Sequence, residues 1–355
     1  MRQLKIADHV VNDESLPFVI AEVGHNHQGK LEQALELIRA ASTAGASAVK
    51  FQKRDNKALF TPAMYNEPYN SENSFGDTYG HHRDALEFGI DEYKVCIAEA
   101  RRLNIIFFST AFDFNSADFL QSLDMPLYKI ASGDLTNLPL LEYVARFEKP
   151  MIISTGGSNF EMIEAAVKTI RKIHNNFAIL QCTASYPADF KQLNLRVIEK
   201  LREQYPENVI GFSGHDNGIA MSTAAFTLGA RIVEKHFTLN RALKGTDHAF
   251  SLEPQGLGKL VRDLQRTSNA LGDGDKVIYE NENAPMRKMR KMIVAKHFLP
   301  AGTKISLEDL EFRSPGDGLG PDKLELVLGR LLTVDVNEYE PILGTALEGF
   351  EEAFA

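Results

Sequence analysis

The sequence predicts an α/β protein: a (β/α)8 barrel of the TIM type, followed by a small C-terminal β-rich domain. Eight short apolar runs recur along the first three quarters of the chain, and amphipathic stretches with helical periodicity separate most of them. This alternation indicates βαβ units and a parallel sheet, and eight such units fit a closed barrel better than an open doubly wound sheet. No GxGxxG motif follows the first run, which disfavours a dinucleotide-binding fold.

The predicted strands share apolar, often β-branched or aromatic cores that end in polar residues. They are Phe18 to Glu22, Ser47 to Gln52, Ile105 to Thr110, Leu127 to Ser132, Met151 to Gly156, Phe177 to Thr183, Val209 to His215 and Arg231 to Phe237. Segments such as Leu31 to Gly45 and Ser222 to Ala230 show the periodicity of the connecting helices. The predicted barrel domain covers residues 1–275.

One connection is much longer than the others. Residues 53–103 separate the second and third strands and contain many aromatic and His residues. Loops of this length in a compact domain are usually functional or disordered. We therefore expect an ordered active-site lid or an oligomer contact, while a structural role without substrate contact stays open.

The pattern changes after Leu271. Residues 271–292 are polar and interrupted by Gly and Pro, which predicts an interdomain linker, placed at residues 276–290. Its basic cluster (Arg287, Lys288, Arg290 and Lys291) fits a solvated face better than a phosphate site. Residues 291–355 contain short strand-like runs and a Gly/Pro-rich loop, and they predict a small domain that is marginal on size grounds alone.

The composition excludes several classes of protein. The 355 residues are 44% hydrophobic and 25% charged, as in an ordered globular protein. A net charge of −9 argues against a nucleic-acid partner, and no stretch approaches the ~18 apolar residues of a membrane span. Two Cys residues in a chain of this length point to a reducing compartment, so we expect a cytoplasmic enzyme.

Polar side chains gather at the carboxyl ends of the predicted strands, where a parallel barrel builds its active site. A lysine inside an apolar run is costly unless it meets an anion, and both Lys50 and Lys129 are of this kind. Two lysines with several hydroxyls at one barrel mouth predict a site for a phosphate and a carboxylate; pairing of each lysine with Glu or Asp is the alternative. The residues at these ends are Glu22, Lys50, Gln52, Thr110, Lys129, Ser132, Asp134, Ser154, Gln181, Thr183, Ser213, His215, Glu234 and His236.

Two histidines are the candidate metal ligands. His215 and His236 end adjacent predicted strands, whose backbones lie about 4.8 Å apart, so two imidazoles can share one divalent ion. Two neutral nitrogen ligands suit a labile Mn²⁺ or a similar Lewis acid better than a structural zinc, and acid–base work by the histidines is the alternative. Asp247, in the turn after the last strand, is placed to hold a substrate hydroxyl or a metal-bound water. The loop histidines (His25, His27, His81 and His82) are expected to be solvated.

Eight short motifs, taken together and in order, resemble the sialic acid synthase family: IAEVGHNHQG, VKFQ, YKIASGD, ISTGG, QCTASYP, FSGHDNGIA, EKHFT and KGTDHAFSLEP. The segment PYNSENSFGDTYGHHRDALEF particularly resembles the animal-type N-acetylneuraminate-9-phosphate synthases and their bacterial relatives. The resemblance covers nearly the whole chain. It implies a (β/α)8 barrel followed by an antifreeze-like SAF domain of the β-clip type, and a domain-swapped homodimer in which each small domain caps the partner's barrel.

The resemblance also implies an activity and a set of roles. The family condenses phosphoenolpyruvate with an N-acylated hexosamine to give a nine-carbon 2-keto sugar acid. A divalent metal, Mn²⁺ with Mg²⁺ or Co²⁺ as alternatives, would be held by the two strand-end histidines, and Glu22 or Asp134 would transfer protons. The implied contacts are Lys50, Thr110, Lys129, Ser132, Ser154 and Ser213 for phosphoenolpyruvate, and Glu22, Gln52, Asp134, Tyr186 and Asp247 for the open-chain sugar.

Three departures from the family pattern concern the acceptor. Asp134 stands where one bacterial branch has Glu, and Ala184 replaces an Asn or Ser that can hydrogen-bond. Ser314 fills the position of a small-domain Arg, and the adjacent Arg313 is the candidate substitute. These changes leave the reaction class untouched and the acceptor open.

Several acceptors and some rival functions stay open. The expected acceptor is N-acetylmannosamine or its 6-phosphate, and a hexose or hexosamine that leads to KDN, legionaminic or pseudaminic acid is the alternative. A metal-dependent barrel aldolase or hydrolase, and a non-catalytic sugar-binding protein, are the remaining alternatives. A second phosphate site has five candidate residues, each of which equally fits an ordinary surface charge: Lys53, Arg54, His82, Arg83 and Lys244.

Overall fold

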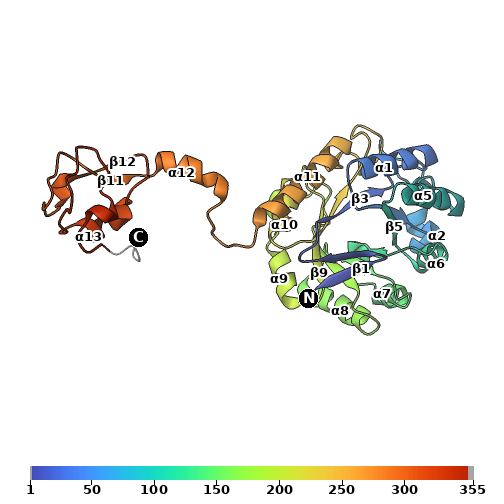
Figure 1. Cartoon of the computed structure of the whole chain (residues 1–355). Coiled ribbons are helices and arrows are strands. Elements are labelled where there is room, and N and C mark those ends of the chain that lie inside the picture. The colour runs from blue at the N-terminus through green and yellow to red at the C-terminus, as the bar shows by residue number, and fades with distance from the viewer. Residues whose placement is uncertain (1, 351–355) are drawn as a thin grey trace. The chain divides into compact units, whose positions relative to one another are not determined.

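The computed structural model describes residues 2–350, and the chain folds as two compact units, residues 1–272 and 273–355 (Figure 1). The boundary between the units falls after Gly272, close to the predicted end of the barrel domain at residue 275. Residues 351–355 of the predicted C-terminal domain lie outside the described part of the chain.

The first unit is built on a closed barrel of eight parallel strands, which confirms the predicted fold class. The strands follow one another around the barrel in chain order, and the last pairs with the first. Their bounds are β3 Phe18–Gly24, β4 Ala48–Lys53, β5 Ile106–Ala111, β6 Tyr128–Ile130, β7 Met151–Ser154, β8 Phe177–Cys182, β9 Val209–Gly214 and β10 Ile232–His236.

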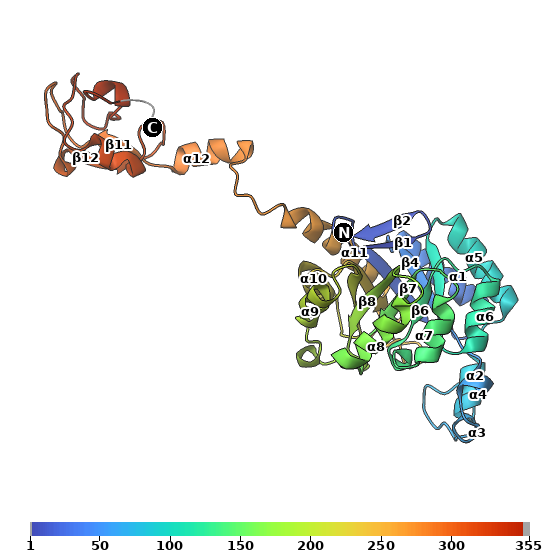
Figure 2. The ribbon, with the colours of Figure 1, turned by 90° about the horizontal axis from the view of Figure 1, so that it is seen from below.

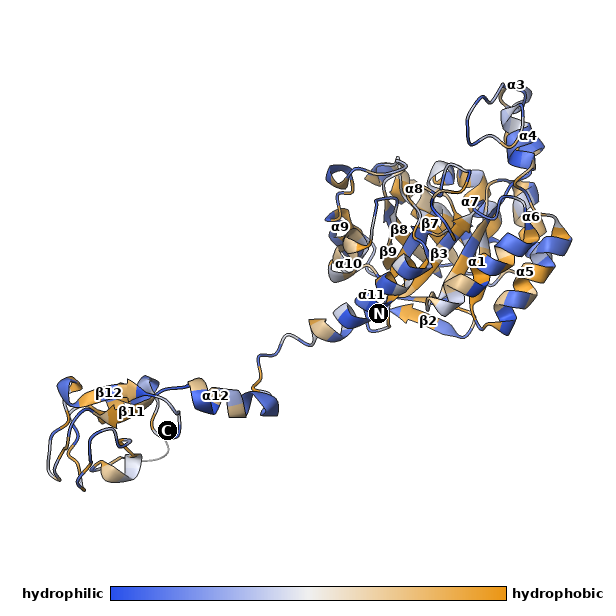
Figure 3. Ribbon diagram, turned by 90° about the horizontal axis from the view of Figure 1, so that it is seen from above, coloured by the Kyte–Doolittle hydropathy of each residue, from blue (hydrophilic) through white to orange (hydrophobic). Residues whose placement is uncertain are grey.

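Amphipathic helices cover the outside of the barrel (Figure 3). The helix at Leu31–Thr43 is typical, because its apolar residues recur every three or four positions and form one buried face. Side-chain caps fix several helix starts: Asp113 accepts from the Ser116 amide, and Asn159 from the Met162 amide. The covering helices are α1 Leu31–Thr43, α5 Ile90–Arg102, α6 Phe114–Ser122, α7 Leu138–Ala145, α8 Phe160–Arg171, α9 Val197–Gln204, α10 Ala220–Thr227 and α11 Pro254–Leu271.

An N-terminal hairpin closes one end of the barrel. Its strands, β1 Gln3–Ile6 and β2 His9–Asn12, pair antiparallel and bury Leu4, Ile6 and Val11 against the apolar interior of the barrel. This hairpin was not predicted from the sequence, because two four-residue strands with alternating polar residues give little signal. With this end filled, the interior of the barrel is accessible from the opposite, carboxyl-terminal end of the strands.

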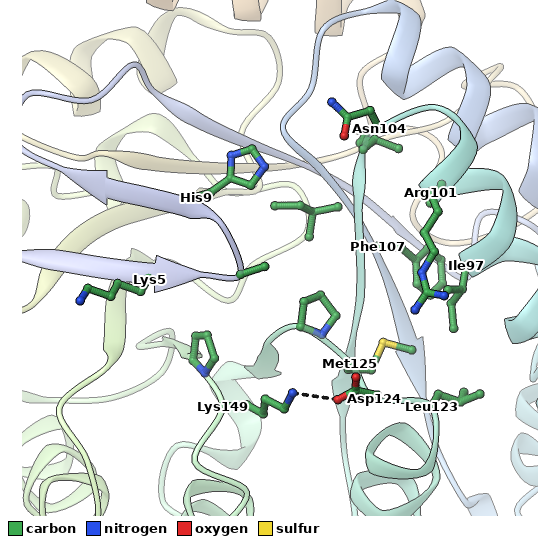
Figure 4. A pocket seen from close by; sticks show the side chains of 16 residues that line it. Lys5, His9, Ile97, Arg101, Asn104, Phe107, Leu123, Asp124, Met125 and Lys149 are labelled. Carbon is green, nitrogen blue, oxygen red and sulfur yellow. Dashed lines mark hydrogen bonds and ion pairs between the residues drawn. The ribbon is translucent and has the colours of Figure 1, made fainter.

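A cavity of about 590 Å³ lies beside the hairpin (Figure 4). It is lined by the hairpin residues Lys5 and His9 and by residues that precede strands of the barrel, with Lys149 paired to Asp124 at 2.8 Å. It therefore lies at the amino-terminal end of the strands, away from the polar strand ends that carry the expected chemistry.

The long connection after β4 is not a single loop, contrary to expectation. Its last quarter is α5, a regular barrel helix of 13 residues. The remainder, residues 54–89 (the excursion below), is ordered and contains three short helices, α2 Asn56–Leu59, α3 Pro62–Tyr65 and α4 Tyr79–Asp84, which lie together beside the barrel (Figure 2). Helical periodicity was hard to see here because the three helices have only four to six residues each.

The second unit has its own small apolar core, formed by residues such as Ile293, Leu299, Leu310 and Ile342. An antiparallel pair, β11 Met292–Ala295 and β12 Leu310–Arg313, is supplemented by isolated bridges and the short helix α13 Leu324–Val327. The expected strand in LLTVDV forms only isolated bridges.

The predicted linker is partly helical, since α12 spans Asn283–Met289. The basic cluster on it is exposed as expected, although Arg287 forms an ion pair with Asp317 at 2.6 Å. Short 3-10 turns complete the chain at Ser132–Asp134, Phe190–Gln192, Glu280–Glu282, Leu307–Asp309, Pro321–Lys323 and Gly344–Ala346. Within residues 2–350, no helix has both the length and the apolar character needed to cross a membrane.

The hairpin yields a stability prediction. Ile6→Ala leaves a cavity between the hairpin and the barrel interior, where Ile6 is fully buried, and is expected to destabilise the protein by about 2–4 kcal/mol. Val10→Ala, at an exposed position of the same hairpin, is the matched control and is expected to stay within about 0.5 kcal/mol of the wild type. Urea unfolding followed by circular dichroism measures both; equal effects would contradict the plugging role of the hairpin.

Candidate active site

A cavity of about 440 Å³ opens at the carboxyl-terminal ends of the barrel strands. It brings together most of the predicted site residues, from almost every strand of the barrel. Its predicted members are Glu22, Lys50, Gln52, Thr110, Lys129, Ser132, Ser154, Tyr186, Ser213, His215, Glu234, His236 and Asp247. Arg54, Arg83, Phe112, Ala131, Gly133, Cys182, Ala184 and Thr246 complete the lining.

Strand register explains why these side chains meet. Neighbouring strands pair Glu22 with Lys50, and Thr110 with Lys129. Across the closure of the barrel, His236 pairs with Glu22. Because side chains alternate between the two faces of a strand, paired residues point to the same side, which here is the interior.

Lys50 is the centre of a buried charge cluster. Its Nζ lies 2.7 Å from Glu22 Oε2 and 3.7 Å from Glu234 Oε1, and it donates to Thr110 Oγ1 at 3.0 Å. Gln52 donates to the other Glu22 oxygen at 2.6 Å. Lys50 is therefore paired with carboxylates, which was one of the two alternatives that the sequence left open for this lysine.

Lys129 differs from Lys50 in having no carboxylate partner. Its Nζ donates to Ser154 Oγ at 2.6 Å and to the Ile130 carbonyl at 2.9 Å, and no Asp or Glu oxygen among the described residues lies within ion-pair distance. The side chain is 2% exposed, and this burial lowers the pKa of Lys129. A buried ammonium with only neutral partners is a seat for an anionic ligand.

The two glutamates have opposite pKa shifts. Burial raises the pKa of Glu22 to about 7, and Lys50 only partly offsets this desolvation. Burial acts in the same direction on Glu234, but Lys50 and Lys129 outweigh it and bring the pKa of Glu234 to about 2. One carboxyl is thus able to exchange a proton near neutral pH, while the other stays ionised beside the lysines.

The two candidate metal ligands lie next to each other, with ring centroids 5.3 Å apart. His215 Nδ1 donates to the Thr183 carbonyl at 2.8 Å, which leaves its Nε2 lone pair free. His236 Nδ1 has no hydrogen-bond partner and lies 3.6 Å from Asp247 Oδ2. Burial lowers the pKa of His236, which favours the neutral form that binds metals.

This donor set fits a divalent cation held by two imidazoles. Within residues 2–350 no group of three or more His, Cys, Asp or Glu side chains forms a complete metal cluster. A cation held by these two histidines would take its remaining ligands from water or substrate, which is typical of a labile ion rather than a structural zinc.

Comparison with known proteins identifies the family. The model of the NeuB family matches residues 37–276, and that of the SAF domain matches residues 290–348. The chain belongs to the NeuB family. Its second unit is a SAF domain, which confirms the predicted architecture of barrel plus antifreeze-like domain.

Relatives of this NeuB chain include named sugar-acid synthases. It is 37% identical to the N-acetylneuraminate-9-phosphate synthase of Mus musculus over 93% of this chain and 92% of the relative. It is also 37% identical to the N,N'-diacetyllegionaminic acid synthase of Campylobacter jejuni, over 91% and 98% of the two chains. The crystal structure of an N-acetylneuraminic acid synthetase from Leptospira borgpetersenii matches with a TM-score of 0.70 and 33% identity, covering 80% of this chain and 95% of that one. These relatives confirm the resemblance to sialic acid synthases.

Three predicted residues of the barrel of this NeuB chain do not line the cavity. Gln181 and Thr183 bond the carbonyls of Leu193 and Gln192 instead, so the expectation that they face the mouth was wrong. Asp134 lies on the 3-10 turn after β6, half-buried beyond the lining. Arg313 lies on β12 in the SAF domain, where it pairs with Glu311 and lies over the Tyr339 ring.

Sequence reasoning missed a buried ion pair behind the histidines. Lys235 Nζ donates to Asp216 Oδ1 at 3.0 Å and to the Asp216 carbonyl at 2.5 Å, with both side chains almost fully buried. The pair joins the residue after His215 to the residue before His236 and so fixes the ends of β9 and β10. The signal was present, since Lys235 lies in an apolar run just as Lys50 does.

Three loop histidines are buried, contrary to the expectation that they are solvated. His27 stacks between Phe51 and Phe88, and burial lowers its pKa well below the ordinary value. His25 bonds Glu87, and His82 packs in the aromatic cluster of the excursion. His81 is exposed.

The raised pKa of Glu22 gives a pH prediction for the ligand-free protein. Because the pKa of Glu22 in the folded state lies above its ordinary value of 4.5, the folded chain holds this proton more tightly than the unfolded chain. The resulting stability is present in full below about pH 4.5 and is lost as the pH rises through about 7. Glu22→Gln removes the titrating group, so the stability of the variant relative to wild type is expected to rise by about 2–3 kcal/mol between pH 4.5 and 8.

Thermal unfolding from pH 4.5 to 8 measures this effect. Glu199→Gln, at an exposed position of α9, is the matched control and should follow the wild-type curve. If the unfolding temperatures of Glu22→Gln and wild type change with pH in the same way, Glu22 does not titrate in this range.

Proposed function

We propose that this protein is a sialic acid synthase that condenses phosphoenolpyruvate with N-acetylmannosamine or its 6-phosphate, releasing phosphate and N-acetylneuraminate or its 9-phosphate. The observation that carries the proposal is the shared cavity of Lys129, a buried cation without a carboxylate, and the pair of adjacent imidazoles. The names of the relatives support the sugar-acid product class. On this proposal the protein is a phosphoenolpyruvate-dependent transferase.

The phosphoenolpyruvate seat is assigned to the inner part of the cavity. Lys129 and Ser154 are already joined by a hydrogen bond, and Ser132 accepts from the Gly156 amide at 3.0 Å. Lys50 and Thr110 form the neighbouring cation and hydroxyl, and Ser213 completes the set beside Glu234. Cations and hydroxyls held in place by strand ends position the phosphate and carboxylate before the reaction begins.

Metal dependence is part of the proposal. His215 and His236 would hold the ion, proposed to be Mn²⁺, with Mg²⁺ or Co²⁺ as alternatives. The chemistry supplied by such an ion is Lewis-acid polarisation of the acceptor aldehyde. Two aromatic rings hold the imidazoles in orientation. The ring centroid of Tyr186 lies 4.2 Å from that of His215, and the ring centroid of Phe250 lies 4.9 Å from that of His236.

The bond changes follow from the two substrates. The methylene carbon of phosphoenolpyruvate attacks the acceptor aldehyde carbon, the new carbon–carbon bond forms, and the aldehyde oxygen takes up a proton. Water adds to the electron-deficient enol carbon and loses one proton, which gives a tetrahedral intermediate. The new hydroxyl on that carbon loses its remaining proton and becomes the ketone carbonyl as phosphate leaves with its bridging oxygen, so the two water protons end on the former aldehyde oxygen and on phosphate. We assign proton transfer to Glu22, because its pKa is about 7 and it lines the cavity, whereas Asp134 does not.

The acceptor contacts are assigned to the polar residues around the histidine pair. Gln52, Tyr186 and Asp247 line this part of the cavity and would bond the hydroxyls of the open-chain sugar. We also propose a homodimer in which Arg313 of each SAF domain reaches the partner's cavity. A cytoplasmic location belongs to the same proposal, because both cysteines are free and buried.

A second candidate is a synthase for another nonulosonic acid, such as KDN, legionaminic acid or pseudaminic acid. Relatives named for legionaminic and pseudaminic acid favour it, the latter at 29% identity. The chemistry at the inner seat is the same, and only the acceptor differs. A panel of hexoses and diacetamido sugars with product mass as readout separates the two candidates.

Phosphoenolpyruvate labelled with ¹⁸O at the bridging position tests the reaction. With Mn²⁺ and either acceptor, the released phosphate is expected to carry the label, as carbon–oxygen cleavage requires. Unlabelled phosphate would contradict the proposed bond changes.

His215→Ala and His236→Ala test the metal site. Each is expected to reduce metal-dependent turnover by about 10²–10³-fold without unfolding the protein, as the loss of several kcal/mol of transition-state stabilisation predicts. His9→Ala, on the hairpin at the other end of the barrel, is the control. Full activity in either site variant would remove the metal assignment.

A further inference from the structure

We propose that Arg54 and Arg83 form an anion subsite in the cavity and that this subsite selects an acceptor carrying its own phosphate, a hexosamine phosphate rather than the free sugar. The inference rests on the proposed function and specifies the acceptor class at the same site. The sequence offered both residues among five candidate cations for a second phosphate site, and their placement in the cavity singles them out.

Arg54 is a buried guanidinium without an acid partner. It directly follows β4, lines the cavity and is 9% exposed. Its Cζ lies 3.7 Å from the centroid of the Phe112 ring, and its Nη1 lies 3.3 Å from both ring nitrogens of His25. No carboxylate oxygen of the described residues lies within 4.0 Å of its guanidinium nitrogens.

Glu87 does not neutralise Arg54 directly, because its oxygens are taken by other groups. Lys53 Nζ lies 3.0 Å from Oε2 and His25 Nε2 lies 3.1 Å from Oε1. The backbone amide of Arg54, and not its guanidinium, donates to Glu87 Oε2 at 3.2 Å. The guanidinium is therefore oriented by neutral neighbours and keeps its donors available.

Arg83 brings a second guanidinium to the same cavity from the excursion. It lies on α4, is half-buried, and donates to Tyr79 Oη from Nε and Nη2 at 3.2 and 2.9 Å. Its guanidinium also has no ion-pair partner among the described residues. Both arginines thus rest beside aromatic rings and present planar donor forks, the geometry that binds phosphate in a bidentate manner.

Two unpaired cations in one partly dry cavity are electrostatically unfavourable without an anion. Burial and the nearby charge of Arg83 lower the pKa of Arg54 to about 10, although the more distant carboxylates of Glu87 and Asp247 favour its charged form. A bound phosphate dianion satisfies both forks at once and removes the repulsion between them.

The position of Arg54 separates this subsite from the phosphoenolpyruvate seat. Arg54 lies four residues beyond Lys50, which at about 3.3 Å per residue corresponds to roughly 13 Å along the direction of β4, toward the mouth. Asp247 lies 3.6 Å from His236 Nδ1 and lines the same cavity as Arg54 and Arg83. An open-chain hexose has its aldehyde and its terminal phosphate at opposite ends, which suits a cavity with the imidazoles at one point and the arginines at another.

The excursion holds Arg83 in place before any ligand binds. Asn56 Nδ2 donates to Asp84 Oδ1 at 2.8 Å, and the Gly245 amide donates to Asn73 Oδ1 at 2.9 Å. At Gly29, where φ is +68°, an added Cβ would lie 2.3 Å from the Ala85 carbonyl oxygen, so only glycine lets the residue after α4 approach this closely. A rigid second arginine binds without the entropic cost of ordering a loop.

The other cationic residues suspected from the sequence have different partners. Lys53 is paired with Glu87 and lies over the Phe119 ring. His82 packs against Tyr69, and Lys244 lies over the Phe75 ring. None of these three lines the cavity.

The test compares N-acetylmannosamine and its 6-phosphate as acceptors, in the full-length protein with phosphoenolpyruvate and Mn²⁺. The wild type is expected to prefer the phosphorylated sugar in kcat/KM. Arg54→Gln and Arg83→Gln are each expected to lower the ratio of the two kcat/KM values about 100-fold, with KM for phosphoenolpyruvate changed less than threefold. Arg54→Lys keeps the positive charge but lacks the planar pair of donors, so its ratio of kcat/KM values is expected to lie between those of the wild type and Arg54→Gln. This second variant keeps the test valid if Arg54→Gln fails to fold. Arg102→Gln, on the exposed face of α5, is the control.

Three results would overturn the subsite: a wild-type preference for the free sugar, an equal loss for both acceptors in the arginine variants, or a rise in KM for phosphoenolpyruvate with the acceptor ratio unchanged. Absence of turnover with either sugar would instead contradict the proposed function. In that case calorimetric titration with N-acetylmannosamine 6-phosphate decides the subsite. Binding that is tighter than that of the free sugar and lost in both Gln variants supports it, and binding indifferent to the arginines or absent overturns it.

Discussion

Lys50 lies 2.7 Å from Glu22 and 3.7 Å from Glu234 inside a barrel whose other interior residues are largely apolar. Charges at this depth are tolerated only when each has a partner, and the cluster supplies partners for three of them. The fourth charge, Lys129, has two neutral acceptors and no carboxylate. Lys129 thus brings to the active end of the barrel an ammonium that has no carboxylate within ion-pair distance, and the seat for an anionic substrate follows from that missing direct partner.

The rest of the barrel maintains this arrangement. The hairpin and the apolar interior close the amino-terminal end, so that water and substrate meet the charges from the other end alone. The pair of Lys235 and Asp216 fixes the strand ends that carry His215 and His236. The excursion contributes to the same cavity, because it carries Arg83, which lines the cavity together with Arg54.

The barrel and most of the site could be predicted because each depends on local pattern. Eight apolar runs with polar ends fix the strands, and closure of a parallel barrel then brings the ends together. Lys50 and Lys129 were visible as charges inside apolar runs. Their different pairing was not, because it depends on which carboxylate the neighbouring strand places opposite each lysine.

The features that were not predicted from the sequence either are too short to show a pattern or depend on contacts between distant segments. The hairpin and the three helices of the excursion are too short for periodicity to show, and α5 was hidden in the same long connection. His27 lies in a loop by sequence but between two Phe rings in space. Arg54 and Arg83 were only two of five candidate cations, since sequence cannot tell which cation already has a partner.

Calorimetric titration of phosphoenolpyruvate into the wild-type protein and Lys129→Met tests the central claim most directly, because it needs neither the acceptor nor turnover. Lys149→Met, at the opposite end of the barrel, is the matched control. If the unpaired ammonium of Lys129 is the phosphate seat, wild type and Lys149→Met bind phosphoenolpyruvate alike, and Lys129→Met binds at least about 100-fold more weakly, as expected for loss of a buried charged partner. Equal affinity in all three proteins would show that the buried lysine does not hold the substrate.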